Sequence, residues 1–210
     1  MLTRVLQRYR PRICPFDIVI DHVPTGARVL DVGCGVGLFL ALLARQGRIH
    51  EAQGFDSSET AIAHARTMLA DHADQEWVSR VSFEQRAVEA GYPEGVFDVV
   101  TMIDVMHHVP PAGQQEALLG AIARTVPGGL LVYKDMCRHP RWRAAANRLH
   151  DLVMARQWIH YVPIKQIETW AVEAGLVLHH AQDAARLWYG HELRVFKRPL
   201  VQADGADSDG

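Results

Sequence analysis

A glycine-rich turn between an apolar strand and an apolar helix constrains the fold of this chain more than any other feature. Residues 28–38 read Arg-Val-Leu-Asp-Val-Gly-Cys-Gly-Val-Gly-Leu, and an apolar segment at helical spacing follows. Glycine lets the backbone adopt positive φ and approach a ligand closely, because it has no Cβ atom. A strand, a tight glycine turn and a helix together begin a Rossmann-like sheet, in which ligands bind at the carboxyl end of the first strand.

Two acidic residues beside this turn discriminate between possible ligands. Asp31 precedes the turn, where its charge would repel a pyrophosphate and attract the ammonium and sulfonium groups of S-adenosylmethionine. Asp56 follows the next apolar run, and an acid about 20 residues after such a turn can accept hydrogen bonds from both ribose hydroxyls. Leu38 stands where the dinucleotide fingerprint has its third glycine. These residues favour S-adenosylmethionine over NAD and disfavour a nicotinamide oxidoreductase.

Four motifs occur in the order typical of class I S-adenosylmethionine-dependent methyltransferases, at residues 29–37, 54–58, 97–109 and 127–135. The chain resembles this family, and within it the small enzymes that methylate small molecules. The resemblance implies an α/β fold, a Rossmann-like three-layer sandwich around a seven-stranded, mostly parallel sheet with an antiparallel last strand. It also implies a helical lid over the substrate at about 138–161.

Apolar periodicity along the chain agrees with alternating strands and helices. We predict strands at 27–32, 51–56, 80–85, 97–103, 128–134, 175–182 and 191–197. We predict helices at 14–22, 36–46, 58–71, 111–125, 140–158 and 163–174.

Length and composition predict one cytoplasmic domain. A chain of 210 residues, 49% hydrophobic, suits a single domain at 1–200, and the acidic residues 201–210 suit a disordered tail. The net charge of −2 argues against a nucleic-acid partner. Three widely spaced cysteines suit reduced thiols, and we find neither a signal peptide nor an apolar run long enough to span a membrane.

The predicted cofactor site combines the glycine turn, the ends of the following strands and the loop after the third strand. The residues assigned to it are Asp31, Gly33, Cys34, Gly35, Gly37, Asp56, Ser57, Ala87, Val88, Ile103 and Asp104. Cys34 is interpreted as a small packing residue of the turn. Ala87 departs from the family, which commonly has an acid there for the adenine amino group, so that backbone groups of 86–88 or the Glu89 side chain would take this role.

Adjacent histidines follow the strand predicted at 97–103, and Asp135 follows the strand predicted at 128–134. An imidazole with a pKa of about 6.5 is a suitable general base for a phenol or alcohol at neutral pH. In some similar enzymes a histidine at this position works with an acid from the fifth strand. We therefore predict that His107 or His108 acts with Asp135. The alternative is that the histidines are structural and that Asp135 caps the next loop.

The acceptor site is less constrained by the sequence. Trp142, His160, Tyr161 and Tyr189 are candidates for substrate contact, although aromatic residues there could equally belong to the core. The arginine-rich segment 138–156 is either a solvated helix or a basic surface for an acyl carrier protein, a phospholipid surface or a carboxylated substrate. Adjacent histidines diverge on regular elements and no His-Glu-x-x-His motif occurs, so we predict no metal.

The resulting hypothesis is a methyltransferase of small-molecule or secondary metabolism that acts on a phenolic, hydroxyl or carboxyl oxygen. The acceptor is either free or carrier-bound. The signature of amino methyltransferases is absent after the strand at 97–103. C-methylation of an aromatic or quinone precursor stays open because it also needs a base, and so does a non-catalytic S-adenosylmethionine-binding regulator.

Overall fold

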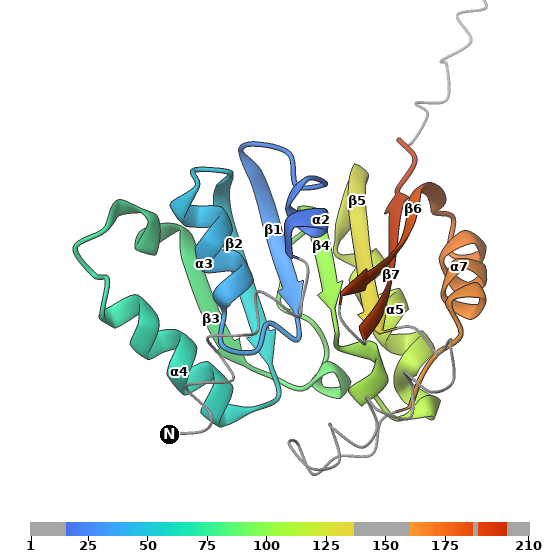
Figure 1. Cartoon of the computed structure of the whole chain (residues 1–210), viewed down its shortest axis with the longest axis horizontal. Helices are drawn as coiled ribbons and strands as arrows, with labels where there is room; N and C mark the ends of the chain where they lie inside the picture. Colours follow the sequence, from blue (N-terminus) through green and yellow to red (C-terminus); the bar gives the residue numbers. More distant parts are fainter. Residues whose placement is uncertain (1–15, 137–159, 187–188, 201–210) are drawn as a thin grey trace, which may run out of the picture.

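Strands and helices alternate along the chain in the computed structural model, which describes residues 16–136, 160–186 and 189–200 (Figure 1). The strands are β1 (Ala27–Val32), β2 (Ile49–Asp56), β3 (Val81–Gln85), β4 (Phe97–Ile103), β5 (Thr125–Met136), β6 (Val177–Arg186) and β7 (Tyr189–Lys197). The α-helices are α2 (Phe16–Ile20), α3 (Leu38–Arg45), α4 (Glu59–Ala70), α5 (Gln114–Ala123) and α7 (Ile164–Glu173). Short 3₁₀ helices are η1 (Glu76–Arg80), η2 (Val88–Ala90), η3 (Met106–His108) and η4 (Pro111–Gly113).

The seven strands form one sheet in the order β3-β2-β1-β4-β5-β7-β6. Strands β1 to β5 pair in parallel, whereas β7 is antiparallel to both β5 and β6. The chain winds outward from β1 to β3 and then returns to β4, so the order reverses between β1 and β4. In open parallel sheets a ligand crevice forms at such a reversal, beyond the carboxyl ends of the strands. The predicted α/β sandwich with an antiparallel last strand is confirmed.

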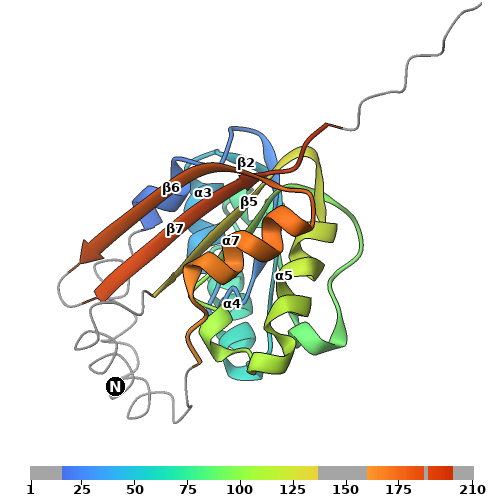
Figure 2. The same cartoon turned by 90° about the vertical axis from the view of Figure 1, so that its right-hand side faces the viewer.

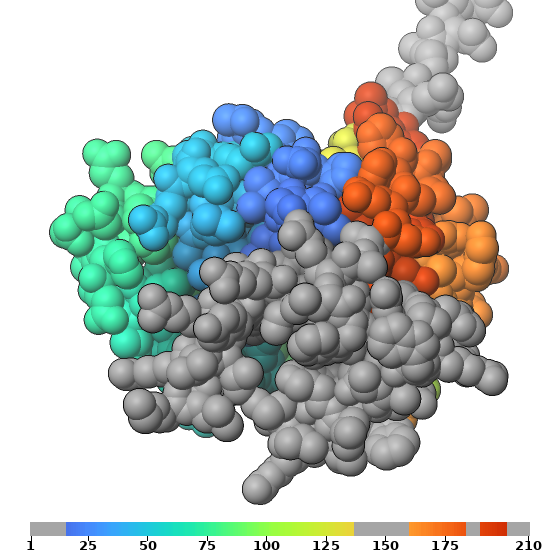
Figure 3. All heavy atoms as spheres, viewed as in Figure 1, coloured from blue at the N-terminus to red at the C-terminus, as the bar shows by residue number. Residues whose placement is uncertain are grey.

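Helices cover both faces of the sheet and create two hydrophobic cores. Val29 packs with residues of α2, α3 and α4 on one face, while its neighbour Leu30 packs with residues of α5 and α7 on the other. Figure 2 shows α5 and α7 together on their face. In the space-filling view, α4 lies at one side of the molecule and α7 and β6 at the other (Figure 3). Strands buried on both faces explain the near-continuous apolar runs of the sequence.

Observed boundaries differ from the predicted ones mainly where tertiary pairing extends a strand. β5 continues to Met136 because Asp135 and Met136 pair with Glu192 and His191 of β7. The helix expected at 111–125 begins as the 3₁₀ helix η4 before α5 starts. Most of the predicted lid, 138–159, the tail at 201–210 and the predicted helix at 140–158 lie outside the described residues.

The glycine turn adopts the backbone conformation that makes glycine necessary there. Gly33, Gly35 and Gly37 all have positive φ, at 70°, 55° and 75°. A Cβ atom on Gly37 would lie 2.2 Å from the ring of Phe83, a buried residue of β3. The turn therefore packs closely against β3. Any residue with a side chain would also be strained at these positive φ angles.

We predict that Gly37→Ala destabilises the protein more than Gly26→Ala does. Both positions have positive φ, but a Cβ on Gly26 meets no atom within 4 Å. Gly26→Ala should cost about 1–2 kcal/mol of conformational strain, and the crowding at Gly37 should add about 1–3 kcal/mol. Urea denaturation of both variants measures the difference. Equal losses would contradict the role assigned to the Phe83 contact.

Candidate functional site

A cavity of about 310 Å³ opens at the carboxyl end of the sheet, where the strand order reverses. Its walls include Gly33, Gly35, Asp56 and Ser57 from the ends of β1 and β2, with Val88 from η2. Asp104, Val105 and His108 close it from the end of β4. A smaller hollow beside it is lined by Asp31, Cys34, Ile103 and Asp104, among others. Asp104 thus borders both spaces, and many of the residues predicted for the cofactor gather around them.

The carboxylate of Asp56 connects the glycine turn to the end of β2. One oxygen accepts a hydrogen bond from the Gly35 amide at 2.9 Å, and the other accepts one from the Ser58 amide at 2.8 Å. Each carboxylate oxygen can accept a further bond, because an ionised carboxyl offers about four lone-pair positions. Asp56 therefore shapes the turn and still faces the cavity with acceptor capacity.

Asp31 lies under the turn and is only 3% exposed. The hydroxyl of Thr101 on β4 donates to its carboxylate at 2.6 Å, which compensates for part of its removal from water. Cys34 is also buried, and its burial together with the charges of Asp31 and Asp56 raises the pKa of the Cys34 thiol far above its usual value. A neutral, unreactive thiol agrees with the predicted packing role of Cys34.

Residues of the loop after β3 also line the cavity. Val88, Glu89 and Arg86 line it, whereas Ala87 precedes η2 and is not among the lining residues. The guanidinium of Arg86 is paired with the Glu84 carboxylate at 2.7 Å. Glu89 is therefore the carboxylate of this loop that borders the cavity.

An ion pair joins the ends of β4 and β5 next to the cavity. The Lys134 ammonium lies 2.6 Å from the Asp104 carboxylate, with side-chain exposures of 0% and 18%. Asp104 has a φ of 54°, which is unusual for a residue other than glycine, and its amide donates to the Lys134 carbonyl. Burial opposes ionisation of Asp104, but the charges of Lys134 and His191 outweigh it and hold the pKa of this carboxyl well below its usual range. Asp104 is thus a fixed negative charge at the cavity.

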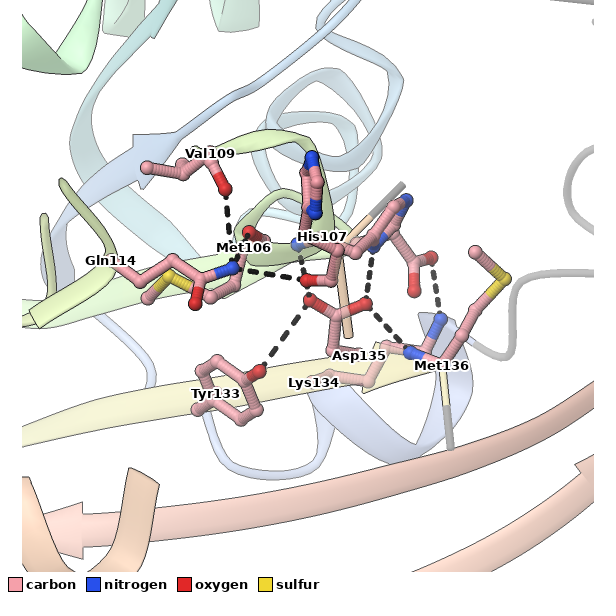
Figure 4. A network of polar contacts seen from close by, with 10 residues as sticks. Met106, His107, Val109, Gln114, Tyr133, Lys134, Asp135 and Met136 are labelled. Carbon is pink, nitrogen blue, oxygen red and sulfur yellow. Dashed lines mark hydrogen bonds and ion pairs between the residues drawn. The ribbon is translucent and has the colours of Figure 1, made fainter. Parts of the chain in front are cut away.

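Next to this ion pair, Asp135 holds His107 (Figure 4). Nδ1 of His107 lies 2.5 Å from the Asp135 carboxylate, which also accepts the His107 amide at 3.3 Å. The Met136 amide and the Tyr133 hydroxyl donate to the same carboxylate. Because an ionised carboxylate can only accept, Nδ1 carries a proton, and Nε2 of the neutral ring keeps its lone pair.

His107 and His108 occupy different environments although they are adjacent. His107 is 3% exposed, whereas His108 is exposed and lines the large cavity. Their rings nevertheless contact each other, with centroids 4.1 Å apart. The structure thus joins Asp135 to His107 and places His108 at the cavity wall.

The chain returns to this site at residues 160 and 161. The His160 amide donates to the His107 carbonyl at 2.8 Å, and the buried Gln114 side chain donates to the His160 carbonyl at 3.0 Å. The Tyr161 ring lies 6.5 Å from the His107 ring. Of the other substrate candidates, Tyr189 begins β7 and its side chain is not described, while Trp142 lies outside the described residues.

Sequence reasoning missed three polar residues that support the site, namely Thr101, Gln114 and Lys134. Each is buried, and Thr101 and Lys134 interrupt apolar strands. A buried polar group needs a partner, so a lysine or threonine within an apolar strand is a usable signal. The sequence alone does not tell which partner lies opposite.

The described residues contain no group of three or more His, Cys, Asp or Glu side chains placed to hold a metal ion. Within the same ranges, no helix combines the length and apolar character needed to cross a bilayer.

Comparison with known proteins agrees with this geometry. The model of the methyltransferase domain family matches residues 2–181. The chain is 35% identical over 162 residues to the ubiquinone biosynthesis O-methyltransferase of Alkalilimnicola ehrlichii, and this match covers 73% of the chain and 62% of the relative. The chain therefore spans less than two thirds of that relative's length.

Solved structures share the fold. An O-methyltransferase family protein from Burkholderia thailandensis superposes with a TM-score of 0.73 at 24% identity, covering 91% of this chain and 56% of that one. Magnesium protoporphyrin IX methyltransferase from Synechocystis with bound SAH gives a TM-score of 0.69 at 17% identity, covering 88% and 81%. By sequence and fold, the chain belongs to the methyltransferase domain family, within the class I S-adenosylmethionine-dependent methyltransferases.

Proposed function

We propose that this protein transfers the methyl group of S-adenosylmethionine to an oxygen of a small molecule bearing a phenolic, other hydroxyl or carboxyl group. The observation that carries the proposal is the buried His107–Asp135 pair, whose ring contacts His108 in the wall of a cavity bordered by two carboxylates, Asp56 and Asp104. The relative named as a ubiquinone biosynthesis O-methyltransferase supports an aromatic hydroxyl acceptor.

The residues around the two hollows fit the groups of S-adenosylmethionine. Asp56 would accept hydrogen bonds from the ribose hydroxyls with its remaining lone pairs. Asp31 and Asp104 would offset the positive charges of the methionine part, and Glu89 would take the adenine edge. The cofactor supplies an electrophilic methyl group on a positively charged sulfur.

The protein's own contribution is to align the acceptor and to remove its proton. Asp135 holds the His107 ring in the tautomer whose Nε2 can accept, so Nε2 takes the hydroxyl proton as the acceptor oxygen becomes nucleophilic. The imidazolium then forms next to a carboxylate, which stabilises its charge. Exclusion of water strengthens both interactions.

The proposed cellular location and the proposed protein partner are supported by the sequence and not by the fold. A cytoplasmic location agrees with the widely spaced cysteines, of which Cys34 is a free thiol in the described part of the chain. An acyl carrier protein or another anionic partner would use the arginine-rich segment 138–156, which lies outside the described residues.

We predict that Asp56→Ala weakens S-adenosylmethionine binding by about 1.5–3 kcal/mol, because a charged acceptor is lost. Asp98→Ala is the matched control. Asp98 also accepts a backbone amide, from Arg28 at 2.8 Å, but it borders a hollow formed by the loops at the opposite end of the sheet. Isothermal titration should therefore find normal affinity for Asp98→Ala. Unchanged affinity for Asp56→Ala, or tight NADH binding by the wild type, would contradict the cofactor assignment.

We predict that His107→Gln lowers turnover about 10²–10⁴-fold, because a positioned base is lost. Cofactor affinity should stay near that of the wild type. Asp135→Asn should also lose turnover, since it favours the wrong tautomer of His107. His108→Gln is the neighbouring control and should lose much less. The assay uses methyl-labelled cofactor with a panel of catechols and hydroxyquinols, and NMR of the product locates the methyl group on oxygen or carbon.

Near-normal turnover of His107→Gln would contradict the base assignment, and a large loss in His108→Gln alone would transfer the role to His108. Retained cofactor binding without transfer to any acceptor would favour the non-catalytic regulator instead.

A further inference from the structure

Three carboxylates stand opposite one another on the three neighbouring strands β5, β7 and β6. Asp135 of β5 pairs in register with Glu192 of β7, and Glu192 pairs with Asp183 of β6. Directly opposed residues project from the same face of a sheet with Cβ atoms about 4.5–5.5 Å apart. Like charges in such positions repel, so the row needs compensating groups.

The two outer carboxylates have such groups and the central one does not. Asp135 is paired with His107, and Asp183 is paired with Arg194 at 2.9 Å. Arg194 is shared with Glu168 of α7, which also contacts the exposed Lys165. The backbone of Glu192 pairs with β5 and β6, but among the described residues its carboxylate makes no hydrogen bond or ion pair.

Glu192 is therefore a half-buried acid between two other acids. Its burial and the charge of Asp183 raise the pKa of Glu192 to about 7, although Arg194 opposes the rise and Asp135 adds to it. The groups that face Glu192 are Asp135 and Tyr133 from β5, Asp183 from β6, Arg194 from β7, and Glu168 from α7. Glu192 thus changes charge in the pH range in which a histidine also titrates.

We infer that Glu192 is a positioning residue for the His107–Asp135 pair, and that its charge sets how strongly the pair stabilises the imidazolium of His107. Ionised Glu192 adds a second negative charge beside Asp135, which favours protonated His107; protonated Glu192 removes that charge. The catalytic meaning of this inference rests on the proposed function, but the electrostatic coupling does not.

The test compares the titration of His107 in the wild type and in Glu192→Gln, using NMR of the full-length protein labelled in its histidine rings. His107→Gln assigns the resonance. Loss of the Glu192 charge should lower the midpoint of His107 by about 0.5–1 pH unit. Glu192→Asp keeps the charge and should keep most of the wild-type midpoint. No acceptor is present, so the result stands even if the proposed methyl transfer is wrong.

Asp183→Asn is the matched control because it also removes one carboxylate charge from the row. The Asp183 side chain is 70% exposed and is paired with Arg194, so its loss should shift His107 by less than about 0.2 pH unit. An unchanged His107 midpoint in Glu192→Gln, or an equal shift in Asp183→Asn, would overturn the inference.

Thermal stability provides a second measurement with a defined sign. A carboxyl whose pKa is raised on folding stabilises the protein below its unfolded pKa, and this stabilisation is lost as pH rises through the folded pKa. The difference in melting temperature, Glu192→Gln minus wild type, should therefore increase by about 2–4 °C when the pH is raised from 5 to 8.5. A difference that is independent of pH would contradict the charged state assigned to Glu192.

Discussion

The site depends on the pairing of charges that the fold removes from water at the ends of β4 and β5. Lys134 is completely buried, and such an ammonium is tolerated only with a close counter-ion. Asp104 provides it, and the bond helps to hold Asp104 in a backbone conformation that few non-glycine residues adopt. Asp104 also borders both hollows. The ion pair that neutralises the buried Lys134 therefore also holds the Asp104 carboxylate at the cavity.

Two parts of the sheet contribute different kinds of groups to the site. The ends of β1 and β2, with the glycine turn, form a backbone cradle, in which the Asp56 carboxylate accepts hydrogen bonds from two backbone amides. The ends of β4 and β5 carry the ionisable pairs, Asp104 with Lys134 and Asp135 with His107. A cradle made of backbone groups tolerates little change in shape, whereas paired side chains can be exchanged within the same fold. This agrees with a family in which one fold serves many acceptors.

The sequence predicted the fold and the glycine turn because both depend on local patterns. Glycine spacing, apolar runs and an acid after the second strand are all visible within a few residues. The partner of Lys134, the contact of Asp135 with His107, and the carboxylate row of Glu192 depend on tertiary pairing, which joins residues far apart in the chain. The extension of β5 to Met136 has the same origin, since only β7 supplies its partner.

The antiparallel direction of β7 has a consequence for how such a protein can diversify. The parallel strands reach the site with their last residues, whereas β7 reaches it with His191 and Glu192, which lie near its start. The end of β6 and the start of β7 pair at this same edge, Arg186 with Tyr189. Insertions between these two strands change this edge of the sheet while leaving the register of the core unchanged. The edge next to the His107–Asp135 pair is thereby separated from the glycine turn, which lies on other strands.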